Sequence, residues 1–93
     1  MRQYELTVIF PLEEDLYKAG RELVQADLAH HGAQIEKTEE MGDRDLAYPI
    51  NKKTRGRYTL YTIKLDPAQL VALERAFKLN NNIIRHLFVK VEE

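Results

Sequence analysis

Polar and apolar residues alternate with a period of two over residues 4–10, which carry Tyr4, Leu6, Val8 and Phe10 on one side. Alternation of aromatic and β-branched residues is typical of a β-strand. Pro11 cannot donate a hydrogen bond to a sheet and ends the strand. Because the first side is the more apolar one, we expect it to face the protein core and the intervening residues to face outward.

From about residue 13 the apolar spacing changes to three and four residues, which predicts an amphipathic helix. The positions with this spacing are Leu16, Tyr17, Gly20, Leu23, Val24, Leu28 and His31. Acidic residues 13–15 suit the positive end of a helix, and Gly32 can adopt the left-handed conformation that commonly ends one. We therefore expect this helix to end at about residue 31.

The middle of the chain predicts an edge strand followed by a basic hairpin. Residues 34–41 are polar on both sides, which is typical of an exposed edge strand. A turn is expected around Gly42. Residues 46–50 contain Pro49 and are expected to be an edge strand or a loop. Residues 51–56 are rich in Lys and Arg, and we interpret them as a hairpin loop.

Residues 57–65 predict a central strand, because they are apolar or aromatic on both faces. Asp66, Pro67 and Gln69 then occupy the N-cap, first-turn proline and capping-box positions of a second helix. The apolar face of that helix comprises Leu70, Leu73 and Phe77. Residues 80–82 end it, and residues 83–91 return to strand chemistry, with Leu87, Val89 and Val91 in alternation.

The predicted order is β-α-β-β-α-β, and its fold class is α+β. This order favours a ferredoxin-like sandwich, in which a four-stranded antiparallel sheet carries both helices on one face. The other face of the sheet is left open. At 93 residues the chain has the length of one small domain, and we expect residues 1–93 to form a single one.

Composition excludes several classes of protein. There is no cysteine, hence no disulfide, thiolate nucleophile or thiolate zinc site. The longest early apolar run, residues 6–12, is too short to span a membrane, and a cytoplasmic location is expected. His30 and His31 are adjacent without a third ligand at metal spacing, and no nucleophile or phosphate-loop motif is present. We therefore expect no catalytic residue, metal, cofactor or small-molecule substrate.

Charge is distributed unevenly, although the formal net charge is only −1. Residues 1–45 carry eleven acids and five bases, whereas residues 46–93 carry four acids and nine bases. Four bases lie within residues 51–57: Lys52, Lys53, Arg55 and Arg57. Long flexible cations suit contacts with phosphate. The alternative is a solvated hairpin whose charges discourage pairing at a sheet edge.

Two other functions remain open from the residues alone. Arg55, Gly56, Tyr58, Leu60 and Tyr61 partly match an RNA-recognition motif, whose aromatic residues stack on bases of single-stranded RNA. Because the match is partial, we favour the interpretation of Tyr58 and Leu60 as packing residues. A ferredoxin-like small-molecule or acylphosphatase-type domain would need an arginine at a glycine-rich turn or a polar pocket, and only Gly56 supports it.

The chain resembles the bacterial small-subunit ribosomal protein six family along most of its length. The resemblance begins with Arg2, Tyr4 and Glu5 and continues through Gly32, Ala33, Glu36 and Lys37. It is strongest at residues 46–50, of sequence LAYPI, followed by Lys52, Gly56 and Tyr58, and it ends with Leu79, Asn80, Asn82, residues 84–87 and Lys90.

The resemblance implies a ferredoxin-like structural protein of the small ribosomal subunit. It further implies binding to the central domain of 16S ribosomal RNA together with small-subunit ribosomal protein eighteen. Arg2, Lys52 and Arg85 match basic positions of the family and are expected to contact RNA, to which charge adds Arg44, Lys53, Arg55 and Arg57. Ile9, Tyr58 and Leu60 are expected to line the open sheet face and pack on the partner protein.

Overall fold

The computed structural model describes residues 1–50, 53–80 and 82–91, and for residues 47–50 and 53 it describes the backbone only. Four strands and two main helices follow in the predicted order. They are β1 (Arg2–Phe10), α1 (Glu14–His30), β2 (Gln34–Ile50), β3 (Lys53–Leu65), the short helix η1 (Pro67–Gln69), α2 (Leu70–Lys78) and β4 (Arg85–Lys90).

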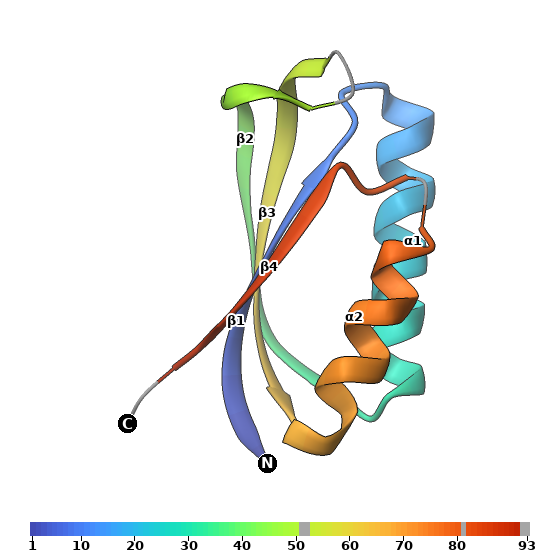
Figure 1. Ribbon diagram of the computed structural model, residues 1–93, viewed down its shortest axis with the longest axis vertical. Coiled ribbons are helices and arrows are strands. Elements are labelled where there is room, and N and C mark those ends of the chain that lie inside the picture. Colours follow the sequence, from blue (N-terminus) through green and yellow to red (C-terminus); the bar gives the residue numbers. More distant parts are fainter. Residues whose placement is uncertain (51–52, 81, 92–93) are drawn as a thin grey trace.

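The strands form one antiparallel sheet in the order β2-β3-β1-β4. Both helices cover the same face of this sheet, and the opposite face carries no helix (Figure 1). The ferredoxin-like prediction is therefore confirmed, including the edge position of residues 34–41 and the central position of residues 57–65. The β2–β3 end of the sheet and the N-terminus lie at opposite ends of the molecule in this view.

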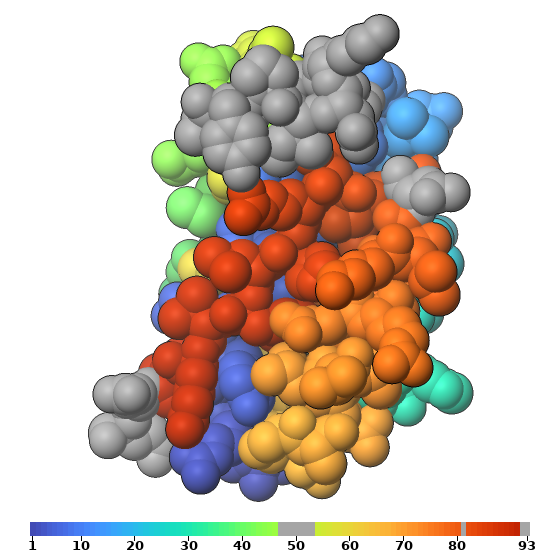
Figure 2. Space-filling view, viewed as in Figure 1, coloured from blue at the N-terminus to red at the C-terminus, as the bar shows by residue number. Residues whose placement is uncertain are grey.

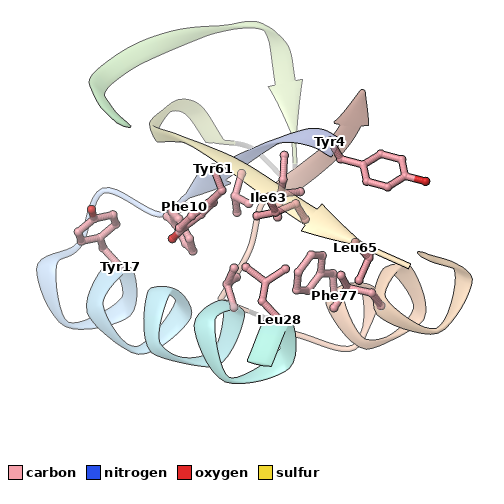
Figure 3. Packing of buried hydrophobic residues seen from close by; sticks show 12 residues of the cluster. Tyr4, Phe10, Tyr17, Leu28, Tyr61, Ile63, Leu65 and Phe77 are labelled. Atoms are coloured by element: carbon pink, nitrogen blue, oxygen red, sulfur yellow. The ribbon is translucent and has the colours of Figure 1, made fainter. Parts of the chain in front are cut away.

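The core lies between the sheet and the helices. Tyr4, Leu6, Val8 and Phe10 of β1 are buried, as their alternation predicted. From β3, Tyr61, Ile63 and Leu65 join them, and the helices contribute Tyr17, Val24, Leu28, Leu73 and Phe77 (Figure 3). Removal of this apolar surface from water stabilises the two-layer arrangement.

Helix boundaries agree closely with the predicted signals. Gly32 has a φ of 76°, the left-handed conformation expected after α1. The Asp66 carboxylate accepts a hydrogen bond of 3.0 Å from the Ala68 N–H, so the N-cap prediction is confirmed. The capping-box prediction differs in one respect: the Gln69 backbone N–H donates to the Asp66 carbonyl over 2.8 Å, which forms the tighter η1 turn.

The turn predicted around Gly42 is wrong, because β2 continues through this residue to Ile50. Gly42 has a φ of 81°, and the pairing register of β2 with β3 shifts between Glu40 and Gly42. A glycine that takes positive φ can insert an extra residue into one strand, which is a β-bulge. The positive φ of Gly42 therefore produces a bulge that bends the edge strand, and the chain does not reverse its direction there.

The predicted hairpin loop over residues 51–56 is too long, since Lys53–Gly56 already belongs to β3. Gly56 pairs with Arg44, and a β-carbon built on it would overlap Cγ2 of Ile9 on β1. A small residue therefore lets the ends of β1 and β3 approach each other. At the other end of the chain, β4 is shorter than the predicted residues 83–91, because Ile83 is held in a turn by the Asn80 carbonyl.

Only part of the predicted apolar face of α1 is buried. Tyr17, Gly20, Val24 and Leu28 face the sheet, whereas Leu16 and Leu23 stay partly exposed. Gly20 is a point of close approach: a methyl group there would lie 2.5 Å from the Asn82 carbonyl oxygen and 3.0 Å from Cδ1 of Phe10. The segment between α2 and β4 therefore crosses directly over α1 at a residue without a side chain.

Gly20→Ala is expected to destabilise the protein, although alanine normally favours a helix over glycine by about 1 kcal/mol. The new methyl group would meet a backbone oxygen, and overpacking of this kind costs about 1–3 kcal/mol. Urea unfolding measures the change in free energy. Ala26→Gly, at an exposed position of α1, is the control and should lose about 1 kcal/mol by the ordinary helix preference. A more stable Gly20→Ala variant would contradict the close approach.

Candidate RNA- and protein-binding surface

The open face of the sheet carries an apolar hollow of about 310 Å³ at the junction of β1, β3 and β4. Its lining residues are Thr7, Ile9, Tyr58, Arg85, His86 and Leu87. Ile9 pairs directly with both Tyr58 and Arg85, and Thr7 pairs with Leu60 and Leu87. These cross-strand pairs bring residues from three distant parts of the sequence into one patch.

Ile9, Tyr58 and Leu60 lie on this open face, where the alternation of each strand puts them. Ile9 is only 8% exposed, because Gly56 and Ile84 pack around its branched end. Leu87 and Val89 of β4 extend the apolar surface and are 55% and 47% exposed. The sequence predicts a strand for these two residues but does not show that they belong to this surface. The pairing of β4 with β1 brings them to the patch.

The basic residues predicted to contact RNA do not form one cluster. Arg44, Arg55 and Arg57 lie near the β2–β3 end of the sheet, whereas Arg2 pairs with Leu65 at the opposite end. Ten residues of extended β3 separate Arg55 from Leu65, a span of about 33 Å at the usual rise per residue. Arg85 lies between these ends, on β4 beside the apolar hollow. Lys52 and the side chain of Lys53 lie outside the described residues.

Arg57 is held within the protein by α1. Its guanidinium contacts the Glu14 carboxylate at 2.7 Å and lies 3.7 Å from the Asp43 carboxylate. It also stacks over the Tyr17 ring, 3.8 Å from the centroid, a cation–π contact. The hydrogen bond to Glu14 raises the pKa of Arg57 above its ordinary value. Arg57 is therefore occupied by intramolecular partners, which the sequence did not indicate because Glu14 is 43 residues away.

The same network continues to Glu40 on the edge strand. The Tyr17 hydroxyl donates a hydrogen bond of 2.7 Å to the Glu40 carboxylate, and Arg21 forms an ion pair with it. Donation from Tyr17 and the charge of Arg21 hold the pKa of Glu40 below its usual value. These contacts tie α1 to β2 and β3 beside the core.

Arg55 and Arg44 are more available for a partner. Arg55 lies 3.1 Å from Asp45, but both side chains are more than half exposed, and surface ion pairs of this kind are weak. Arg44 is exposed and donates to the Met41 carbonyl over 3.3 Å. Each can exchange its present contact for a phosphate at small cost.

The described residues include no group of three or more potential metal ligands. Within the same part of the chain, no helix combines the length and the apolar character needed to cross a bilayer.

Residues 3–90 match the family model described as ribosomal protein S6. The small ribosomal subunit protein bS6 of Treponema denticola is 50% identical over 93 residues, which is the whole of both chains. The chain belongs to the ribosomal protein S6 family. Its bS6 relative from Halalkalibacterium halodurans is 44% identical over 95 residues, again across the whole of both chains.

The crystal structure of 30S ribosomal protein S6 from Thermotoga maritima is similar to this fold, with a TM-score of 0.86 and 29% identity. The match covers 97% of this chain and 87% of that one. The P2 domain of the Thermotoga maritima chemotaxis kinase CheA has a TM-score of 0.66 at 17% identity, covering 97% and 98% of the two chains, and shares the fold alone.

Membership of the S6 family confirms several expectations at once. The chain is a structural, non-enzymatic protein of the small ribosomal subunit, and its place is with ribosomal RNA in the cytoplasm. The acylphosphatase-type alternative is thereby removed.

Arg57→Gln should destabilise the protein by about 1 kcal/mol, through loss of the contacts with Glu14 and Tyr17. Arg55→Gln is the matched control at an exposed position of the same strand and should change the free energy of unfolding by less than about 0.5 kcal/mol. Urea unfolding of both variants measures the difference. Equal stabilities would show that Arg57 is as weakly held as Arg55.

Proposed function

We propose that this S6 protein binds the central domain of 16S ribosomal RNA jointly with small-subunit ribosomal protein eighteen. The observation that carries the proposal is the apolar hollow on the open sheet face, bordered by Arg85. An uncovered apolar patch beside a cation suits a surface shared by a protein and an RNA. The single sheet that all described strands join also supports the proposal that residues 1–93 form one domain.

The protein partner is proposed to cover Ile9, Tyr58 and Leu60 together with Leu87. Ile9 is nearly buried already, so Tyr58, Leu60 and Leu87 provide most of the surface that a partner would remove from water. Burial of apolar area at about 25 cal/mol per Å² supplies the main driving force for such docking.

RNA contact is proposed for Arg85 beside this patch, for Arg44 and Arg55 near the β2–β3 end and for Arg2 at the opposite end of the sheet. Lys52 and Lys53 are added to the proposal from the sequence alone. Arg57 contributes least, because Glu14, Asp43 and Tyr17 already occupy its guanidinium. The net charge of −1 supports joint binding, since a chain without excess positive charge is poorly suited to neutralise many phosphates alone. A partner protein that is itself basic would supply the rest.

Labelled central-domain RNA, titrated with this protein alone and then with protein eighteen present, tests the joint binding. We expect weak, strongly salt-dependent binding by the protein alone and at least tenfold tighter binding by the pair, about 1.4 kcal/mol. Protein eighteen alone with the same RNA is the control. Tight binding without protein eighteen, reduced by about 1–3 kcal/mol in Tyr58→Ala, would favour the RNA-recognition-motif alternative instead.

Leu87→Asp is expected to weaken binding to protein eighteen by about 2 kcal/mol or more, because it puts a charge into an apolar contact. Leu87 is 55% exposed, so the fold should tolerate the change. Val71→Asp, on the outer side of α2 and 67% exposed, is the matched control and should bind like the parent. Calorimetric titration with purified protein eighteen gives both affinities. If only Val71→Asp lost binding, the partner would dock on the helices.

A further inference from the structure

A second hollow, of about 290 Å³, lies between the end of α2 and the start of β4. Figure 2 shows these two elements side by side, in orange and red. Phe77, Ile83 and Ile84 form its apolar walls, and the polar side chains of Lys78, Asn80 and His86 line it. Arg85 also borders it, but it pairs with Ile9, so its side chain belongs to the open face. This volume is at the lower limit of pockets that hold small molecules, so a compact group is the expected occupant.

The polar lining is rich in hydrogen-bond donors. Lys78 is a cation whose side-chain nitrogen only donates. The side-chain oxygen Oδ1 of Asn80 accepts the Asn82 N–H over 2.9 Å, which directs the remaining Asn80 Nδ2 elsewhere. That nitrogen is buried and has no acceptor within the described part of the chain. A buried amide donor is costly to leave unpaired, so an oxyanion that reaches it gains more than it would from an exposed amide.

His86 adds a neutral wall to the hollow. Its ring lies edge-to-face with Phe77, at 5.4 Å between centroids, and with Phe88, at 5.9 Å. The pKa of His86 lies below its ordinary value, chiefly because burial disfavours the charged ring. The Glu74 carboxylate opposes this shift, and the charge of Lys78 adds to it. Glu74 lies one turn before Lys78 on α2 and is not part of the lining. The groups that line the hollow therefore contribute positive charge and donors, with one carboxylate at the side.

The carbonyl end of α2 would by itself disfavour an anion. Two of its last carbonyls are already occupied: Ala76 accepts the Leu79 N–H over 3.2 Å, and Phe77 accepts the Asn80 N–H over 3.1 Å. The full charge of Lys78 exceeds the partial charge that remains.

Arg85 and His86 line both hollows, the apolar one on the open face and this donor-rich one beside α2. We infer that the donor-rich hollow binds a backbone phosphate of the RNA, and that residues 85–86 form the boundary between the RNA site and the protein site. The inference rests on the proposed function and adds Lys78, Asn80 and His86 to it. It also says where on the surface the RNA and the partner protein meet.

The RNA test uses the complete pair with protein eighteen and measures affinity over a range of salt concentrations. Lys78→Gln should weaken RNA binding and lower the slope of log affinity against log salt by about 1, because one phosphate contact is lost. Lys37→Gln, with the same charge change on the opposite edge strand, should leave the slope as it is. Calorimetry without RNA should give unchanged affinity of Lys78→Gln for protein eighteen. Equal slopes for both variants would overturn the inference.

A second measurement uses inorganic phosphate and the folded protein alone, followed by NMR. Phosphate should move the Asn80 side-chain amide signals and raise the pKa of His86, because a nearby anion favours the imidazolium. Chloride at equal ionic strength is the control. Asn80→Asp keeps the acceptor for Asn82 but repels phosphate, and it should abolish the response. An unchanged Asn80 amide and His86 pKa in the parent protein would overturn the inference.

The two possible failures can be told apart. If the unmodified pair does not bind the RNA, the proposed function fails irrespective of the hollow. If the unmodified pair binds and Lys78→Gln binds with the same affinity and slope, only the phosphate site fails. Phosphate shifts at Asn80 combined with an unchanged RNA slope would mean that the hollow takes free phosphate, which also overturns the RNA inference.

Discussion

The packing of both helices onto a single face of the sheet is the constraint on which the rest of the molecule depends. It requires β1 and β3 to turn Leu6, Val8, Tyr61 and Ile63 inward, and strict alternation then turns Ile9, Tyr58 and Leu60 outward. Because β1 is paired on both sides, the outward residues of β3 and β4 are brought to one surface. The strands that form the core with their inward residues therefore form the candidate binding surface with their outward residues, and no additional helix or strand is needed for it.

Most of the fold could be predicted because its determinants are local. The period of two over residues 4–10, the wider spacing that follows, Gly32 and Asp66 all act within a few residues, and each predicted the element that the structure contains. Gly42 was ambiguous for a physical reason, since positive φ serves both a turn and a bulge. Only the pairing of β2 with β3 decides between them, and that pairing is a tertiary property.

The site was less predictable because it depends on contacts between distant residues. Arg55 and Arg57 look equivalent in the sequence and lie two residues apart on one face of β3. Arg57 reaches Glu14 at the start of α1, whereas Arg55 contacts the exposed Asp45 on the edge strand. Arg2 has the right charge but lies at the far end of the sheet. Asn80 and His86 match the family pattern without an assigned role and Lys78 has no motif, and only the approach of α2 to β4 brings them together. Family resemblance supplied what physical chemistry alone left open, namely the ribosomal setting.

Residues 85–86 separate two hollows with a wall one strand thick. Arg85 faces the open side of the sheet and His86 faces α2, so occupants of the two hollows are coupled through this short stretch of β4. Thermodynamic linkage then imposes symmetry: if the first occupant raises the affinity for the second by some factor, the second raises that for the first equally. The final stability of the ribonucleoprotein is then the same whichever occupant binds first.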